Sequence, residues 1–168
     1  MRCIAESVDR IRESVPNLPT PEVLLRGFHP RDLPAVARIV ADALHEHYDS
    51  SLYYSLSQQW PAGFLIAADG SDAPVGFLLG VTQVEGEARV LMFAVERGWR
   101  TRGVGTTLMN EFLERCRARS MRRTTLEVRV SNVAAIRFYT RFRFSVTDLL
   151  RGYYSDGESG YQMARDMP

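Results

Sequence analysis

The chain has 168 residues, 45% of them hydrophobic, which is enough for one domain with a single core and too little for two comfortable ones. Its formal net charge of +1 gives no overall reason to expect a nucleic acid as a partner. No apolar run is long enough to span a bilayer and no signal-peptide core opens the chain, so we expect a cytoplasmic protein without membrane association.

The first half of the chain is expected to form an arm and then an antiparallel meander. Residues 1–21 end in the proline-rich stretch PNLPTP, which favours an extended connection, so the folded domain is expected over 22–168. A strand over 23–28 and a helix opened by 29–32 come next, and the polar and aromatic segment 45–60 is either helical or irregular. Strands separated by short turns are then expected over 63–69, 74–84 and 87–96.

The second half of the chain alternates between helices and strands. Helices are expected over 103–119 and 132–142, and strands over 124–130, 144–150 and 159–166. An antiparallel first half joined to this alternating second half predicts an α/β (mixed α+β) fold. We expect a single central mixed, largely antiparallel sheet of about seven strands with helices on both faces.

The stretch WRTRGVGTT (99–107) places two arginines and two glycines at the expected start of a helix. A helix N-terminus carries unpaired N–H groups and a partial positive charge, and glycines let the backbone approach an anion closely. The stretch is therefore a candidate phosphate cradle. The plainer interpretation is that the glycines only make a turn and the arginines are solvated.

Glu127 lies within the apolar strand TTLEVRV (124–130). In a strand, Glu127 and Arg129 point to one face and the apolar residues between them to the other. If the strand is central and covered on both faces, a carboxylate there is costly unless it is paired or functional. The alternative is that Glu127 and Arg129 are neighbours on a solvated sheet face.

Two further features stand near the expected second-half helices. Asn132 can cap the helix that follows it, and Tyr139 lies about two turns into that helix, as a core aromatic or as a functional group. The adjacent Tyr153 and Tyr154 stand beside turn formers in a loop, where they can cover a ligand groove or pack against the sheet edge.

The sequence offers no metal site. Cys3 and Cys116 are far apart in no metal-binding spacing, so neither a disulfide nor a zinc site is expected. The tripeptide His45-Glu46-His47 lacks the HExxH spacing that puts two histidines on one face of a helix.

In this order and spacing, the segments resemble the GNAT superfamily of acetyltransferases. FAVERGWRTRGVG (93–105) is similar to the superfamily's acetyl-CoA signature, and the similarity continues through LEVRVSNVAAIRFYTRFRF (126–144) and RGYYSDGESGYQMARDM (151–167). This second half resembles N-terminal α-amine acetyltransferases of the archaeal and NatA catalytic-subunit type, which are related to the bacterial ribosomal-protein-alanine acetyltransferase.

The resemblance implies the GNAT fold, with acetyl-CoA bound in a split between the strands that end near Val95 and Val130. The residues implied in holding this cosubstrate are Phe93, Ala94, Val95, Arg100, Arg102, Gly103, Val104, Gly105, Thr106 and Asn132.

The resemblance also implies catalytic roles. Glu127 matches a glutamate taken as general base and Tyr139 a tyrosine taken as general acid, in a direct transfer through a ternary complex. The implied acceptor is the N-terminal α-amine of a protein or peptide, with ribosome association possible and a monomer or homodimer as the expected state.

Four residues are implied in binding the acceptor. Tyr153 and Tyr154 match a tyrosine pair that lines the peptide groove, and Glu46 and Tyr48 fall in a stretch that shapes the pocket for the first residue. The alternative functions are acetylation of a small amine and an arginine-rich module over 115–123 that binds RNA or the ribosome.

The chain departs from the resemblance at two places. Arg143 stands where the superfamily usually has Gly or Asn, which matters if that turn needs a positive φ. Ser159-Gly160 replaces a more usual Asp-Ala at the end of the tyrosine loop.

Overall fold

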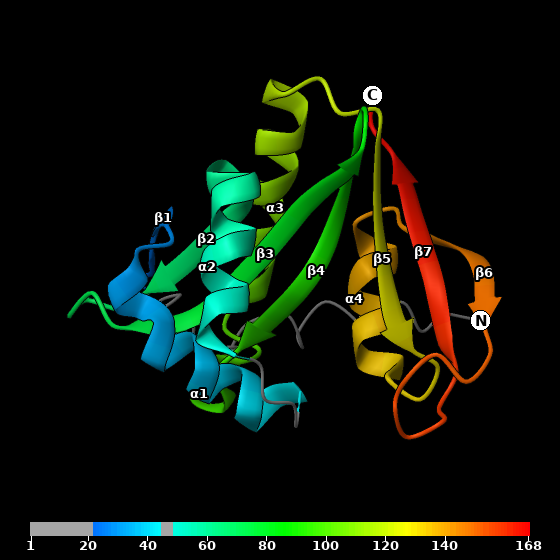
Figure 1. Ribbon diagram of the computed structural model, residues 1–168. Helices are drawn as coiled ribbons and strands as arrows, with labels where there is room; N and C mark the ends of the chain where they lie inside the picture. Colours follow the sequence, from blue (N-terminus) through cyan, green and yellow to red (C-terminus); the bar gives the residue numbers. More distant parts are fainter. Residues whose placement is uncertain (1–21, 45–48) are drawn as a thin grey trace, which may run out of the picture.

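Seven strands form one sheet in the computed structural model, which describes residues 22–44 and 49–168 (Figure 1). The strands are β1 (Leu24–Gly27), β2 (Phe64–Ala68), β3 (Pro74–Val84), β4 (Glu87–Val95), β5 (Arg123–Arg129), β6 (Ser145–Leu150) and β7 (Gly160–Asp166). Their order across the sheet is β1-β2-β3-β4-β5-β7-β6, and all neighbours are antiparallel except β4 and β5. The predicted mixed, largely antiparallel sheet is confirmed.

Helices cover both faces of the sheet, also as predicted. The α-helices are α1 (Leu33–Leu44), α2 (Ser50–Gln59), α3 (Val104–Ala118) and α4 (Val133–Arg141), and the 3-10 helices are η1 (Pro30–Asp32), η2 (Pro61–Gly63) and η3 (Arg97–Trp99). In Figure 1, α1 and α2 lie in front of the sheet and α3 and α4 behind it. None of the helices within the described ranges has the length and apolar character needed to cross a bilayer.

The segment that the sequence left as helical or irregular is a helix over its described part. Asp49 caps α2 by accepting a hydrogen bond from the backbone N–H of Ser51 at 2.8 Å. Tyr53 and Leu56 then fall on one face and are buried, so the segment is amphipathic. The arm expected over 1–21, and the substrate residues Glu46 and Tyr48, lie outside the described residues.

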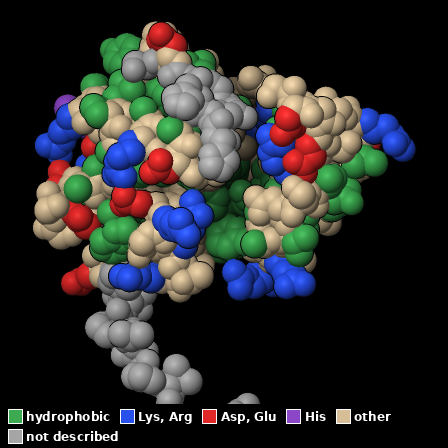
Figure 2. Space-filling model, turned by 90° about the horizontal axis from the view of Figure 1, so that it is seen from below, with side chains coloured by type: hydrophobic (Ala, Val, Ile, Leu, Met, Phe, Trp, Pro, Cys, Tyr) green, Lys and Arg blue, Asp and Glu red, His purple; other side chains and the backbone are tan. Residues whose placement is uncertain are grey.

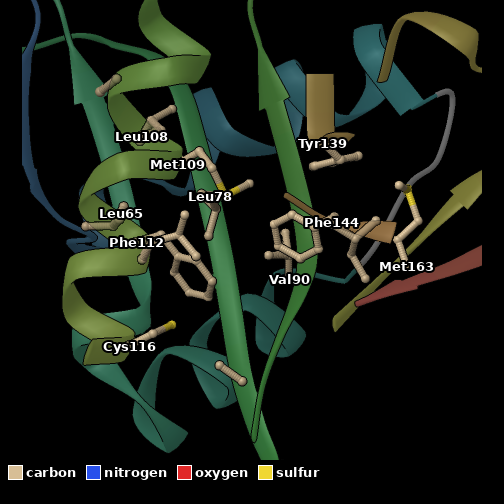
Figure 3. Close-up of a cluster of buried hydrophobic side chains, with 14 of the residues drawn as sticks. Leu65, Leu78, Val90, Leu108, Met109, Phe112, Cys116, Tyr139, Phe144 and Met163 are labelled. Carbon is tan, nitrogen blue, oxygen red and sulfur yellow. The ribbon is translucent and has the colours of Figure 1, made fainter. Parts of the chain in front are cut away.

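Alternate residues of the central strands face two separate cores, because both faces of the sheet are covered. All five residues of β2 are buried. Leu65 and Ala67 pack with α3, whereas Phe64 and Ile66 pack with α1 and α2. Figure 3 shows the core on the α3 side, with α3 packed along the sheet and Tyr139 near Phe144.

The thiol of Cys116 belongs to this core. The residue is fully buried in the last turns of α3, at the opposite end of the cluster from Tyr139 (Figure 3). Burial raises the pKa of the thiol to about 11, because the charged form cannot be solvated there.

A charged network fastens β1 to the start of the first helix. Arg26 donates Nη1 and Nη2 to the two carboxylate oxygens of Asp32 at 2.7 and 2.8 Å, and its Nε donates to Asp72 at 2.6 Å. The backbone N–H of His29 donates to Asp32 as well, at 2.8 Å. Asp32 is only 2% exposed, so these partners satisfy a carboxylate that water cannot reach.

The turn from α4 into β6 requires the left-handed conformation at Arg143, whose φ is 65°. A residue with a Cβ pays roughly 1–2 kcal/mol there, which is why Gly or Asn suits such a position. The turn sets Phe144 into the core, with its ring centre 5.9 Å from that of Tyr139. Arg143 therefore occupies a position that does need a positive φ.

Candidate functional site

The site is built where β4 and β5 diverge. The two strands pair from Glu87 opposite Arg123 to Val90 opposite Leu126. Beyond that register, β4 stays paired with β3 and β5 with β7, so the strands separate toward their C-terminal ends (Figure 1). The split opens the middle of the sheet on one side and leaves the end of β4 without a neighbour on its β5 side.

A groove of about 690 Å³ opens along this split. Figure 2 looks at this end of the molecule and shows a hollow with hydrophobic side chains in it and basic side chains on both of its sides. The lining residues come from α1, the end of β4, the turn before α3, the start of α3 and α4: Ala43, Phe93, Ala94, Val95, Arg100, Thr101, Gly103, Gly105, Thr106, Asn132, Ala134, Ala135, Phe138, Tyr139 and Arg141.

The structure brings together eight of the ten residues predicted to hold the cofactor. Arg102 and Val104 do not line the groove. The Arg102 guanidinium lies over the ring of Trp99, with its Cζ 5.9 Å from the ring centre, and Val104, the first residue of α3, is buried in the core.

Sequence reasoning missed one wall of the groove. Ala134, Ala135, Phe138 and Arg141 lie along α4 after Asn132, and Ala135, Phe138 and Arg141 follow Asn132 at intervals of three residues. Helical spacing from Asn132 could have identified this stripe, because residues three or four apart share a helix face. Nothing in the spacing says that this face meets the end of β4.

The N-terminus of α3 is open to the groove. Gly103 precedes the helix with a φ of 85°, and no side chain of the described residues caps the first turn. A Cβ on Gly105 would lie 3.4 Å from the ring of Phe93 and 3.6 Å from that of Phe138. The backbone N–H groups here can meet an anion directly.

Arg100 is oriented toward the same place. Its Nε donates to the carbonyl oxygen of Val95 at 2.9 Å, and its Nη groups have no partner among the described residues. The described lining contains the guanidinium groups of Arg100 and Arg141 and no carboxylate. Together with the apolar walls and the open helix end, this lining fits acetyl-CoA, which has an apolar arm and a phosphorylated end.

Tyr139 lies at the inner side of the groove. Its ring packs against Phe138 at 5.4 Å and Phe144 at 5.9 Å between ring centres. Burial raises the pKa of its hydroxyl well above the ordinary tyrosine value, and Tyr154 nearby adds to this shift. The hydroxyl has no hydrogen-bond partner within the described part of the chain, so a protonated donor is available to a ligand.

Glu127 is paired with an arginine that the sequence did not single out. Its Oε2 accepts from Nε of Arg89 at 2.8 Å and lies 2.7 Å from Nη2 of the same side chain. The Glu127 side chain is 12% exposed. Arg89 is partly buried, which lowers its pKa, but the hydrogen bond and charge of Glu127 outweigh this, and the pKa is raised. The alternative in which Glu127 and Arg129 are solvated neighbours is not what the structure shows.

The tyrosine loop between β6 and β7 is fastened to the sheet beside Glu127. Nη2 of Arg89 donates to the Tyr153 hydroxyl at 3.0 Å, and the rings of Tyr153 and Tyr154 meet edge to face at 5.1 Å. Burial raises the pKa of Tyr154 to about 12, and this hydroxyl interacts electrostatically with Glu127 and with Tyr139. Arg89 therefore joins Glu127 on β5 to the tyrosine loop through two hydrogen bonds.

Arg129, on β5, makes several contacts with the same loop. Its guanidinium lies 4.0 Å from the centre of the Tyr154 ring, and its Nη1 donates to Asp156 and Glu158 at 2.8 Å each. A Cβ on Gly160 would lie 3.2 Å from the Tyr154 ring, so the glycine lets the tyrosine pair rest on the sheet.

Comparisons with known proteins agree with this geometry. The model of the acetyltransferase (GNAT) family matches residues 33–144. An uncharacterized N-acetyltransferase of Methanocaldococcus jannaschii is 35% identical over 87% of this chain and 93% of its own length. The N-alpha-acetyltransferase of Saccharolobus solfataricus is 28% identical over 85% of this chain and 92% of its own length. Among solved structures, that of Ard1 from Thermoplasma volcanium superposes with a TM-score of 0.84 and has 39% sequence identity. The match covers 87% of this chain and 98% of that one.

Proposed function

The chain belongs to the GNAT family of acetyl-CoA-dependent acetyltransferases, and we propose that its acceptor is the N-terminal α-amine of proteins or peptides. The observation that carries this proposal is the tyrosine loop beside Glu127. Tyr153 is 45% exposed although its hydroxyl is held by Arg89, so a large aromatic surface is fixed at the rim of the split. Such a surface suits a peptide chain. N-alpha-acetyltransferases among the relatives support the same acceptor.

An α-amine is easier to deprotonate than a lysine amine. With a pKa near 7.7–8.0, about a tenth or more of an α-amine is already neutral at pH 7, whereas a lysine amine near 10.4 is neutral in well under about 1%. Only the neutral amine can attack. A modest base therefore suffices for an N-terminus.

Glu127 is the proposed base. Arg89 occupies Oε2, and Oε1 has no partner among the described residues, so this oxygen can take the proton of the amine directly or through one water. Acetyl-CoA supplies the thioester carbonyl that the amine attacks. The backbone at the end of β4, which has no β5 neighbour there, provides N–H groups for the carbonyl oxygen.

Tyr139 is the proposed partner of the leaving sulfur. Its pKa lies above that of a thiol, about 8.5, so complete proton transfer to the thiolate is uphill and a hydrogen bond is the favoured interaction. No covalent enzyme intermediate is required. The thiol of Cys116 is buried at the opposite end of the core and takes no part.

Three of the five arginines in the stretch 115–123, the segment of the alternative RNA-binding module, make contacts within the fold. Arg115 pairs with Glu111 at 2.8 Å and donates to the carbonyl of Ala62 at 3.1 Å. Arg117 pairs with Glu114, and Arg119 lies over the Trp60 ring at 5.6 Å. These guanidinium groups are used within the fold.

Release of free CoA from acetyl-CoA tests the acceptor. Four peptides are compared: one starting with Ser or Ala, one with Met-Leu, one with Met-Glu, and one with a blocked N-terminus and an internal lysine. Turnover is expected only with free N-termini, and their ranking gives the preference for the first residue. Turnover with none of them, but with a small amine, would contradict the proposal.

A further inference from the structure

We propose that Arg141 binds a phosphate group of acetyl-CoA and so contributes to the affinity for the phosphorylated end of the cosubstrate. The inference rests on the groove being the acetyl-CoA site, and it does not depend on which amine is acetylated.

Arg141 stands next to the open end of α3. It is in the last turn of α4 and lines the groove, with its Cζ 5.8 Å from the centre of the Phe138 ring. The same ring lies 3.6 Å from where a Cβ on Gly105 would be. Arg141 and the start of α3 therefore both lie beside the ring of Phe138 and line the same groove, which places a phosphate at that helix end near the long arginine side chain.

The charge on the cosubstrate calls for a further cation. The 3′-phosphate of CoA is a monoester that carries about −1.5 to −2, and the two phosphates of the pyrophosphate add about −1 each. The N-terminus of α3 offers about +0.5, and Arg100 offers one full charge. Arg102 is stacked over Trp99 outside the lining. Arg141 is then the remaining cation of the described lining, which contains no carboxylate to oppose a phosphate.

The Arg141 guanidinium is also available to bind a ligand. Within the described residues it makes no ion pair and no hydrogen bond, only the contact with the face of Phe138. A guanidinium can donate two parallel hydrogen bonds to one phosphate, and stacking on an aromatic ring restricts its orientation beforehand.

Arg137 provides a matched control one helical turn earlier. It is exposed on α4, has no ion pair among the described residues, and does not line the groove. Replacing it removes the same charge from the same helix, so a general electrostatic effect on an anionic ligand would appear in both variants.

Isothermal titration of CoA and of 3′-dephospho-CoA, without any acceptor, tests the inference on the full chain. Arg141→Gln is expected to raise the Kd for CoA about tenfold, the size expected for a charge-assisted hydrogen bond, and Arg137→Gln to change it less than about twofold. A loss confined to CoA assigns Arg141 to the 3′-phosphate, and an equal loss with both ligands assigns it to the pyrophosphate.

Two results would overturn the inference. One is an Arg141→Gln protein that binds both ligands as tightly as the wild type, and the other is an equal loss in Arg137→Gln. Far-UV circular dichroism and thermal unfolding show whether each variant is folded. Because binding is measured without a peptide, a failure of the proposed acceptor would leave this result unaffected.

Discussion

Arg89 reaches from β4 across the start of the split and holds one carboxylate oxygen of Glu127 with two of its nitrogens, at 2.7 and 2.8 Å. The same side chain donates to the hydroxyl of Tyr153. One guanidinium thus fixes both the proposed base and the loop that would receive the peptide. Arg89 is a positioning residue, since it acts through groups that meet the substrates.

Replacing Arg89 should impair both functions of this arrangement. Arg89→Met keeps most of the apolar stem and is expected to lower kcat about 10- to 100-fold, because Glu127 loses its orientation, and to raise the KM for the peptide. Arg89→Lys should restore part of kcat, since it keeps the charge but not the paired donors. Arg123→Met, on an exposed residue of β5, is the control. A loss of stability with unchanged kcat and KM would show that Arg89 is only structural.

The proposed roles of Glu127 as base and of Tyr139 as hydrogen-bond donor to the leaving sulfur can be separated by isosteric changes. Glu127→Gln is expected to lower kcat by about 10²- to 10⁴-fold, the range for loss of a general base. Tyr139→Phe keeps the aromatic packing and removes a hydroxyl that has no partner among the described residues, so kcat should fall about tenfold or more with little change in unfolding temperature. Steady-state kinetics at saturating acetyl-CoA measures both. Unchanged kcat in both variants, with the fold preserved, would make the roles assigned to Glu127 and Tyr139 wrong.

The strained turn after α4 offers a gain in stability. Arg143→Gly removes a Cβ from a residue with a φ of 65° and relieves a cost of about 1–2 kcal/mol, part of which is lost to the greater freedom of glycine in the unfolded chain. It also removes a charge that, with Arg117, lowers the pKa of Arg165 after burial. The free energy of unfolding should rise by about 0.5–1 kcal/mol in urea denaturation. Arg137→Gly, inside the helix, should lower it by about 1 kcal/mol.

The buried Asp32 should make stability depend on pH. Burial raises its pKa, but the hydrogen bonds from Arg26 and from the backbone of His29 outweigh this, and the pKa is lowered. A lowered pKa in the folded state means that the contribution is complete above the ordinary aspartate value, about 3.9, and is lost as the pH falls through the folded value.

Asp32→Asn tests this contribution. At pH 7 the substitution should lower the free energy of unfolding by about 2–3 kcal/mol. The loss is smaller than that for a buried arginine with no other partner, because Arg26 still pairs with Asp72. The difference from the wild type should stay constant down to about pH 5 and shrink in more acidic solution. Asp42→Asn, on an exposed position of α1, should change stability by less than about 0.5 kcal/mol. A difference that grows in acid would contradict the sign argued here.

The sequence predicted the elements well where one physical signal dominates. The strand expected over 74–84 has those bounds in the structure, because its apolar run is bounded by turn residues on both sides. Gly103 and Gly105, which the sequence predicted to stand at the start of a helix in a candidate phosphate cradle, do line the groove at the start of α3. The split between β4 and β5, in contrast, came from the family resemblance, since no local pattern reports where two strands separate.

The remaining site residues depend on contacts that the sequence does not display. Arg89 resembles any solvated strand residue, and its partner is 38 positions away. Arg100 and Arg102 look equivalent, but η3 and the positive φ of 61° at Thr101 turn the first toward the groove, while the second lies over Trp99. The directions of these two side chains depend on backbone turns, and neither composition nor residue spacing determines those turns.

The buried thiol described in the core has a practical consequence. With a pKa of about 11 and no exposed surface, Cys116 can react with an alkylating reagent only when the core around α3 opens. In a Cys3→Ser background it is the single thiol of the chain. The rate of its modification then measures how often the core around α3 opens. The factor by which CoA lowers that rate measures how much the ligand stabilises the packing of α3 against the sheet.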